Sequence, residues 1–126
     1  MKARTGRCNV QDFRKLNVWE KGHALTLSVY KATLRFPKEE LYGLTSQIRR
    51  ASASIPANIA EGCGRSGKAE LARFLQVAMG SASEVDYHLL LARDLGYLDA
   101  SPYGELDGRA KEVERMLTSF IARVKS

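Results

Sequence analysis

The stretch LTSQIRRASASIPANIAE, residues 44–61, decides how this 126-residue chain folds. Its three isoleucines are spaced by seven and four residues, which places them on one face of an α-helix. The many alanines favour this helix over the competing strand interpretation. Pro56 lies well inside the stretch, where it removes one backbone hydrogen bond and crowds the carbonyl of Ser52. We therefore expect a helix that is kinked at Pro56.

A helix is also predicted upstream, from Asn17 to about Leu34. Asn17 followed by Glu20 has the spacing of a capping box, and Phe36-Pro37 ends the helix because a residue before proline avoids the α conformation. The apolar residues of this helix fall on two faces, one with Leu16, Leu27, Tyr30 and Leu34 and the other with Val18, Leu25, Val29, Ala32 and Phe36. A helix with a single buried stripe needs only one such face, so this helix is either central in its own bundle or meets another subunit.

Two more helices are predicted downstream. The first runs from Gly67 or Lys68 to about Leu95, with Ser66 as its N-cap and Gly96 as the left-handed residue after its end. Its apolar residues follow a 4-3-4-3 spacing, which is a heptad seam of Leu71, Leu75, Ala78, Ala82, Val85, Leu89 and Ala92. Ser101-Pro102, a cap followed by proline at the first helical position, starts the last helix.

Four helices joined by short connectors predict an all-α fold, an antiparallel up-down-up-down four-helix bundle over residues 13–126. Residues 1–12 are then a basic leader. No apolar run is long enough to span a membrane, and no apolar core of a signal peptide follows the N-terminal cations, so we expect a cytoplasmic protein without membrane contact. In that compartment Cys8 and Cys63 are expected to be a reduced pair rather than a disulfide.

The formal net charge of +6 is unevenly distributed along the chain. Residues 1–40 hold nine Lys and Arg against four Asp and Glu, whereas residues 97–126 hold five of each. A concentrated positive charge attracts polyanions, which points to a nucleic-acid partner, while ordinary solubilising charge is the alternative interpretation.

Catalytic patterns are weak. A di-metal bundle needs two Glu-x-x-His motifs, and only Glu20-Lys-Gly-His23 has that spacing. The chain has no nucleophile elbow, phosphate loop or dinucleotide-binding motif. The sequence therefore predicts a protein that is not an enzyme and holds no metal or cofactor.

A polar stripe runs along the helix that contains Pro56. Its members are separated by three or four residues and are Gln47, Arg50, Ser54, Asn58, Glu61 and Arg65. One interpretation is a solvated face or a hydrogen-bond network that offsets the break at the proline. The other is a nucleic-acid site, because the arginine fork binds phosphate with two parallel hydrogen bonds. The candidate residues for that site are Arg49, Arg50 and Arg65 with Arg4, Arg7, Arg14 and Lys15.

Two segments, YGLTSQIRRASASIPANIAEGCGR at residues 42–65 and RFLQVAMGSASEVDYHLLLARDLGYL at residues 73–98, resemble the 23S rRNA-intervening sequence proteins. The resemblance implies an antiparallel four-helix bundle, and a homopentamer as the assembly seen in several members. A related protein is the accessory protein of diversity-generating retroelements, which works with a reverse transcriptase. The expected function is therefore a non-enzymatic oligomer that binds RNA or DNA through a basic face, and the alternative is a protein–protein adaptor.

Overall fold

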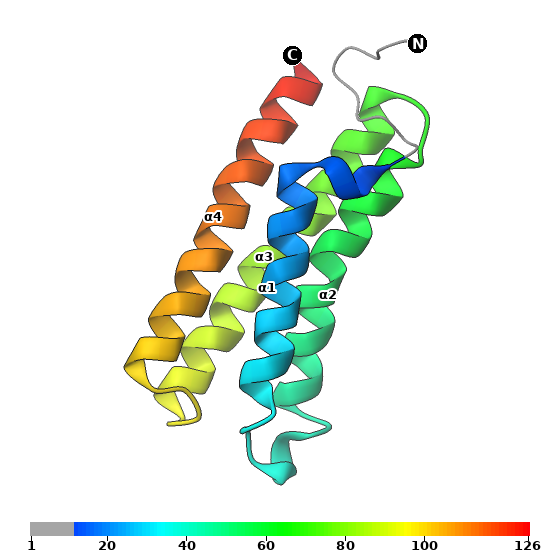
Figure 1. The fold of residues 1–126 in the computed structure, drawn as a ribbon. Helices are drawn as coiled ribbons and strands as arrows, with labels where there is room; N and C mark the ends of the chain where they lie inside the picture. Colours follow the sequence, from blue (N-terminus) through cyan, green and yellow to red (C-terminus); the bar gives the residue numbers. More distant parts are fainter. Residues whose placement is uncertain (1–11) are drawn as a thin grey trace.

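The computed structural model describes residues 12–126, and in that range it contains α-helices and short 3-10 turns but no strand (Figure 1). The α-helices are α1 (Asn17–Thr33), α2 (Leu44–Cys63), α3 (Lys68–Asp94) and α4 (Ala100–Lys125), and the turns are η1 (Phe13–Lys15) and η2 (Lys38–Glu40). This arrangement confirms the predicted all-α four-helix bundle. None of these helices is both long and apolar enough to cross a membrane, as judged from the described residues.

The helices are arranged as a bundle in which each one packs against two others. α1 and α3 both contact α2 and α4. Consecutive helices run in opposite directions in Figure 1, so the beginning of α1, the end of α2, the beginning of α3 and the end of α4 meet at one end. We call this the upper end, following the view of Figure 1, and the opposite one the lower end.

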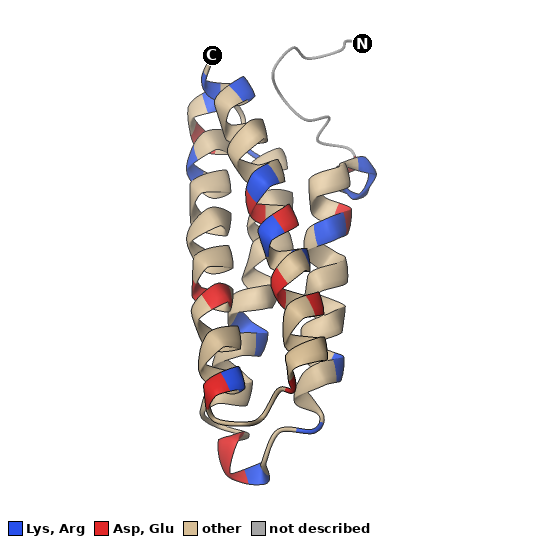
Figure 2. Cartoon of the chain, turned by 90° about the vertical axis from the view of Figure 1, so that its left-hand side faces the viewer, with Lys and Arg blue, Asp and Glu red and all other residues tan. Residues whose placement is uncertain are grey.

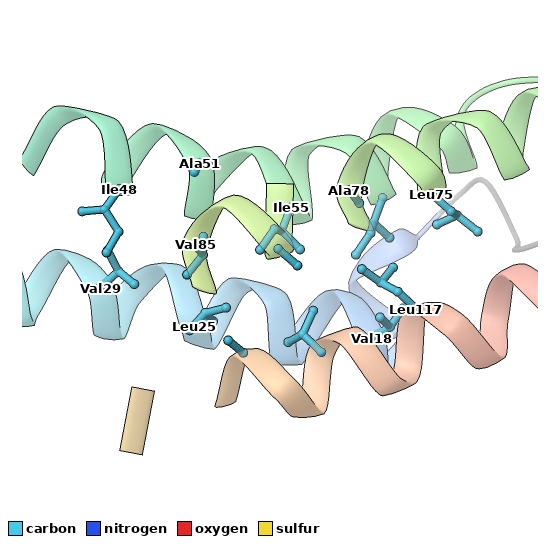
Figure 3. Close-up of a cluster of buried hydrophobic side chains, with 14 of the residues drawn as sticks. Val18, Leu25, Val29, Ile48, Ala51, Ile55, Leu75, Ala78, Val85 and Leu117 are labelled. Atoms are coloured by element: carbon cyan, nitrogen blue, oxygen red, sulfur yellow. The ribbon is translucent and has the colours of Figure 1, made fainter. Parts of the chain in front are cut away.

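The core lies along the bundle axis and contains the predicted heptad seam of α3. All seven seam residues are buried, and six of them are 0% exposed. Figure 3 shows seam residues such as Leu75, Ala78 and Val85 meeting Leu25 of α1 and Leu117 of α4. The second apolar face of α1 is different, since Leu27 is 56% exposed, Tyr30 44% and Leu34 76%. That face is therefore not central within this chain.

α2 continues through Pro56, which is buried inside it. Proline has no N–H group, so the carbonyl of Ser52 lacks its usual helical donor. The hydroxyl of Thr26 on α1 supplies a donor instead, with Oγ1 2.8 Å from the Ser52 oxygen and 3.1 Å from the oxygen of Gly22. A Cβ on Gly22 would lie 3.2 Å from Ile55, so glycine permits the close approach of α1 to α2 at this level. The kink itself stays a prediction.

The predicted capping residues of three helices are wrong by one or two positions. Asn17 is the first residue of α1 rather than its cap, and Leu16 occupies the N-cap without a side-chain hydrogen bond, so the capping box does not form. Likewise Gly67, not Ser66, caps α3, and Asp99, not Ser101, precedes α4. None of these three caps makes a side-chain hydrogen bond, so the preference of short polar residues for caps does not fix where these helices begin.

The end of α3 is as predicted. Gly96 has a φ of 84°, in the left-handed region that favours glycine. Its N–H donates to the carbonyl of Arg93 at 3.0 Å, and the N–H of Tyr97 donates to that of Ala92 at 2.8 Å. These two bonds form a Schellman motif, which satisfies carbonyls that the helix end would otherwise leave free.

Cys63, the last residue of α2, is 1% exposed and disulfide-bonded. The expectation of a reduced cysteine is therefore wrong for this residue. Its sequence setting between two glycines gives no indication of which sulfur comes near it in space. Cys8 lies outside the described residues.

Candidate nucleic-acid interface

The middle of the polar stripe on α2 faces α3. Ser54 and Asn58 are half-buried, and the Asn58 amide donates to Ser54 Oγ at 2.9 Å and to the Ser54 carbonyl at 2.8 Å. Ser81 of α3 donates to Ser54 Oγ across the interface at 2.8 Å. These residues therefore form a hydrogen-bond network between two helices, as the structural interpretation of the stripe expects.

The lower part of the stripe also reaches toward α3. Arg50 donates a short hydrogen bond to Gln47 Oε1, and its guanidinium lies 3.7 Å from Glu84 of α3. His88 lies 3.1 Å from the same Glu84 carboxylate. Arg50 is nevertheless exposed over 63% of its side chain, so it remains accessible from solvent.

Arg49 holds the end of α1 rather than facing solvent. Its Nε donates to Thr33 Oγ1 at 2.8 Å, and its guanidinium lies 4.8 Å from the centre of the Tyr30 ring. Thr33 is buried, and its hydroxyl donates a hydrogen bond to the carbonyl of Val29 at 2.8 Å. Arg49 is thus used for packing between α1 and α2, and the fork expected to bind phosphate is already occupied.

Arg65 ends the stripe at the upper end of the bundle. It pairs with Glu61 at 2.7 Å and lies over the Phe74 ring at 5.1 Å. Arg73 lies 4.5 Å from the centre of the same ring and forms two hydrogen bonds to Glu70, which raise the pKa of Arg73 and lower that of Glu70. Two guanidinium groups therefore gather around one aromatic ring.

The predicted nucleic-acid residues do not form one site. Arg14 and Lys15 of η1 lie at the same end of the bundle as Arg65. Arg50 is 15 residues before Arg65, which corresponds to about 22 Å along a helix. Arg4 and Arg7 lie outside the described residues. The structure therefore separates the arginines in the middle of α2 from the basic group at the upper end.

Positive charge is concentrated at the upper end of the bundle. Charge counts over consecutive residue ranges do not show this, because the cations come from separate segments. Within residues 12–17, 61–73 and 115–126 there are eight Lys and Arg against three Asp and Glu, a formal charge of +5. We call these cations the basic end: Arg14, Lys15, Arg65, Lys68, Arg73, Arg115, Arg123 and Lys125. At the lower end, five cations are outnumbered by six anions: Lys31, Arg35, Lys38, Arg93 and Arg109 against Glu39, Glu40, Asp94, Asp99, Glu105 and Asp107. Figure 2 shows blue segments predominating around the C-terminus and mixed colours at the opposite end.

Two grooves flank the last turns of α4 at the basic end. The first has a volume of about 570 Å³, and its charged lining residues are Lys15, Arg115 and Arg123. The second, of about 480 Å³, has Lys68, Arg73 and Lys125. Neither groove is lined by an Asp or Glu of the described residues. Both grooves therefore have cations but no carboxylate among their lining residues, although Arg73 of the second groove is paired with Glu70 outside it.

A carboxyl pair lies one turn below these grooves, between α3 and α4. Asp86 and Glu114 face each other, and Lys111 Nζ lies 3.1 Å from Asp86 Oδ1. Partial burial, together with a hydrogen bond that only the protonated acid can donate to Asp86, raises the pKa of Glu114 to about 7. Folding therefore changes the protonation of Glu114 near neutral pH.

The free energy of unfolding is expected to fall as the pH rises from about 4.5 to about 7. The folded state keeps a proton on Glu114 in this range while the unfolded state has lost it, so a rising pH favours unfolding. Glu114→Gln should weaken this dependence and raise the melting temperature at pH 8. Thermal melts followed by circular dichroism at several pH values measure it, with Glu112→Gln, which removes a charge nearby on the same helix, as the control. Equal pH dependence in both variants would contradict the assignment.

Within residues 12–126, no group of three His, Cys, Asp or Glu side chains is placed to hold a metal ion. His23 of the single Glu-x-x-His motif is stacked on Trp19, with ring centres 4.9 Å apart. The geometry of the described residues thus offers charged grooves and a packed core as its main features.

Comparison with known proteins places these features in a family. A crystal structure of a protein of unknown function from the S23 ribosomal protein family of Bacteroides thetaiotaomicron is similar, with a TM-score of 0.75 and 25% sequence identity. The match covers 82% of this chain and 97% of that chain. Among curated proteins, none matched. The family model of the 23S rRNA-intervening sequence proteins matches residues 14–119, which span all of α1, α2 and α3 and most of α4, so the chain belongs to that family.

Proposed function

We propose that this chain is a non-enzymatic protein that binds the phosphate backbone of RNA or DNA at its basic end. The observation that supports the proposal best is the gathering of eight cations against three anions at one end of the bundle, while the other end has no excess of positive charge. A positive field of this kind attracts nucleic acid and supplies most of the affinity of non-specific binding.

The availability of the cations favours the basic end over the middle of α2. The side chains of Lys15, Lys68, Arg115 and Lys125 make no hydrogen bond or ion pair with any residue that the structure describes, so their charges can approach a phosphate directly. Arg49, in contrast, would have to leave Thr33 and Tyr30. Breaking those contacts opposes binding, so we place the ligand at the upper end.

A salt titration tests this proposal. A fluorescently labelled single-stranded oligonucleotide should bind at low salt, and its affinity should fall as salt rises, with a slope of log K against log salt of about −0.7 for each phosphate contacted. Four contacts would give a slope of about −3. Fluorescence anisotropy at increasing KCl concentrations provides the slope. No binding at the lowest salt concentration, or an affinity independent of salt, would reject the proposal.

We also propose that the chain forms a homo-oligomer through the exposed apolar face of α1. Leu27, Tyr30 and Leu34 are separated by three and four residues and share one side of the helix, and each is at least 44% exposed. An apolar stripe of this kind is typical of a surface that is covered in an assembly. The resemblance to family members that assemble as homopentamers favours five subunits.

Light scattering after size exclusion should give a mass several times that of the 14.0-kDa chain. Leu27→Glu combined with Leu34→Glu should dissociate the assembly, because two charges would then be buried without partners. Leu95→Glu, at a leucine that is 49% exposed beyond the end of α3, should leave the mass unchanged. A monomeric wild-type chain at micromolar concentration would contradict the oligomer.

A protein–protein adaptor, such as an accessory of a reverse transcriptase, is the second candidate, and the same apolar face of α1 favours it. It requires that the chain does not bind oligonucleotides, so the salt titration above separates the two candidates. The cytoplasmic location expected from the sequence stays a prediction. The disulfide at Cys63 argues against it, because such bonds are rare in a reducing compartment.

A further inference from the structure

The groove between η1 and α4 differs from its neighbour in what forms its floor. Besides three cations, it is lined by Val18 and by three larger apolar side chains, those of Leu16, Met116 and Phe120. The second groove has only small apolar residues on its floor, namely Ala69, Ala72 and Val124. Both grooves can hold a phosphate, but the first places larger apolar side chains, those of Leu16, Met116 and Phe120, beside its cations.

The polar groups of this first groove are arranged around that apolar floor. Lys15 lies on the wall formed by η1, and Arg115 and Arg123 lie on the wall formed by α4. The Arg123 guanidinium donates to Ser119 Oγ at 3.1 Å and lies over the Phe120 ring at 5.4 Å from its centre. Asn17, at the first position of α1, adds an amide with both donors and an acceptor.

This combination matches one nucleotide whose base is not paired. Its phosphate carries the negative charge that three cations require, and its base has an apolar face that can cover the floor. The volume of about 570 Å³ lies within the range of about 300–1,000 Å³ found for small-ligand sites. A duplex would have to extrude a base to use the floor, at a cost in pairing and stacking, so a single strand fits better.

We propose that the groove lined by Lys15, Arg115 and Arg123 binds one unpaired nucleotide of a single-stranded nucleic acid, with the base on the apolar floor. This inference rests on the proposed function and adds the substrate class, a single strand with accessible bases. The second groove then contacts only the backbone of the same strand.

A comparison of two strands of equal length tests the inference. One is a labelled 12-nucleotide single strand of mixed sequence, and the other has the same phosphates but abasic sites in place of the bases. The strand with bases should bind at least about fivefold more tightly in anisotropy titrations at low salt, as expected for one stacked base. Equal affinities would overturn the inference but leave the proposed function standing. No binding of either strand would reject both.

A second test uses a variant with a larger uncharged side chain in the groove and a control variant with a similar change outside it. Ser119→Leu introduces a larger side chain at an exposed position in this groove, and Thr118→Leu makes a comparable change next to it, outside the groove lining. Ser119→Leu should remove the preference for the strand with bases while leaving the affinity for the abasic strand within about twofold. Thr118→Leu should keep both affinities. Asn17→Leu, on the opposite wall, should act like Ser119→Leu. A preference that survives both groove variants would overturn the inference.

Discussion

Replacing Thr26 with valine is expected to lower the free energy of unfolding by about 1–3 kcal/mol, the typical cost of a buried polar group left without a partner. Valine has nearly the shape of threonine but no hydroxyl. The Ser52 carbonyl then loses the donor that lies 2.8 Å away, and Pro56 cannot replace it. Urea unfolding followed by circular dichroism at 222 nm measures the difference.

A double-mutant cycle shows whether the loss arises from this pair. Pro56→Ala returns an N–H group that can donate to the Ser52 carbonyl within α2. In the Pro56→Ala background, Thr26→Val should therefore cost clearly less than it does in the wild type. If the cost is the same in both backgrounds, Thr26 does not substitute for the missing donor, and its contribution comes from packing alone.

The positions of the helices could be predicted because local patterns determine them. The heptad seam of α3, the glycine after its end and the proline within α2 are all read directly from neighbouring residues. Thr26 could not be recognised in this way, because its partner Ser52 is 26 residues away and meets it only when α1 packs on α2. The same holds for Cys63, whose bonding depends on which part of the chain comes near it.

The polar stripe illustrates a second limit of the sequence. Spacing shows that Gln47, Ser54 and Asn58 share a face of α2, but it does not show what that face meets. In the structure, Ser81 of α3 covers the middle of the stripe. Arg49 was likewise expected to bind phosphate, and it is held by Thr33 instead.

The sequence does indicate the basic end, but a charge count over residues 97–126 as a whole hides it. Residues 97–126 contain five cations and five anions and therefore appeared neutral. The five anions all precede Arg115, however, and Arg115, Arg123 and Lys125 follow without an acidic residue. Asp99, Glu105 and Asp107 lie at the beginning of α4, whereas Arg123 and Lys125 lie in its last turn. The charge of a helix of 26 residues therefore has to be counted separately for each end.

Neutralising three cations of the basic end is expected to weaken nucleic-acid binding about tenfold or more at low salt. Lys15→Gln, Lys68→Gln and Arg115→Gln remove charges that are exposed and make no ion pair within the described residues, so the fold should be preserved. Each lost phosphate contact should reduce the steepness of the salt dependence by about 0.7, hence by about 2 in total. Melting curves of the variant verify that its stability is unchanged.

The measurement that tests the central claim most directly compares this triple variant with a matched one at the lower end. Lys31→Gln, Arg35→Gln and Lys38→Gln remove two lysines and one arginine, which are also exposed, and cause the same change in net charge. Anisotropy titrations of a labelled single strand over a range of salt concentrations should give a weakened affinity and a shallower slope for the basic-end variant only. An equal loss in both variants would mean that net charge, and not the basic end, determines binding, and would contradict the account.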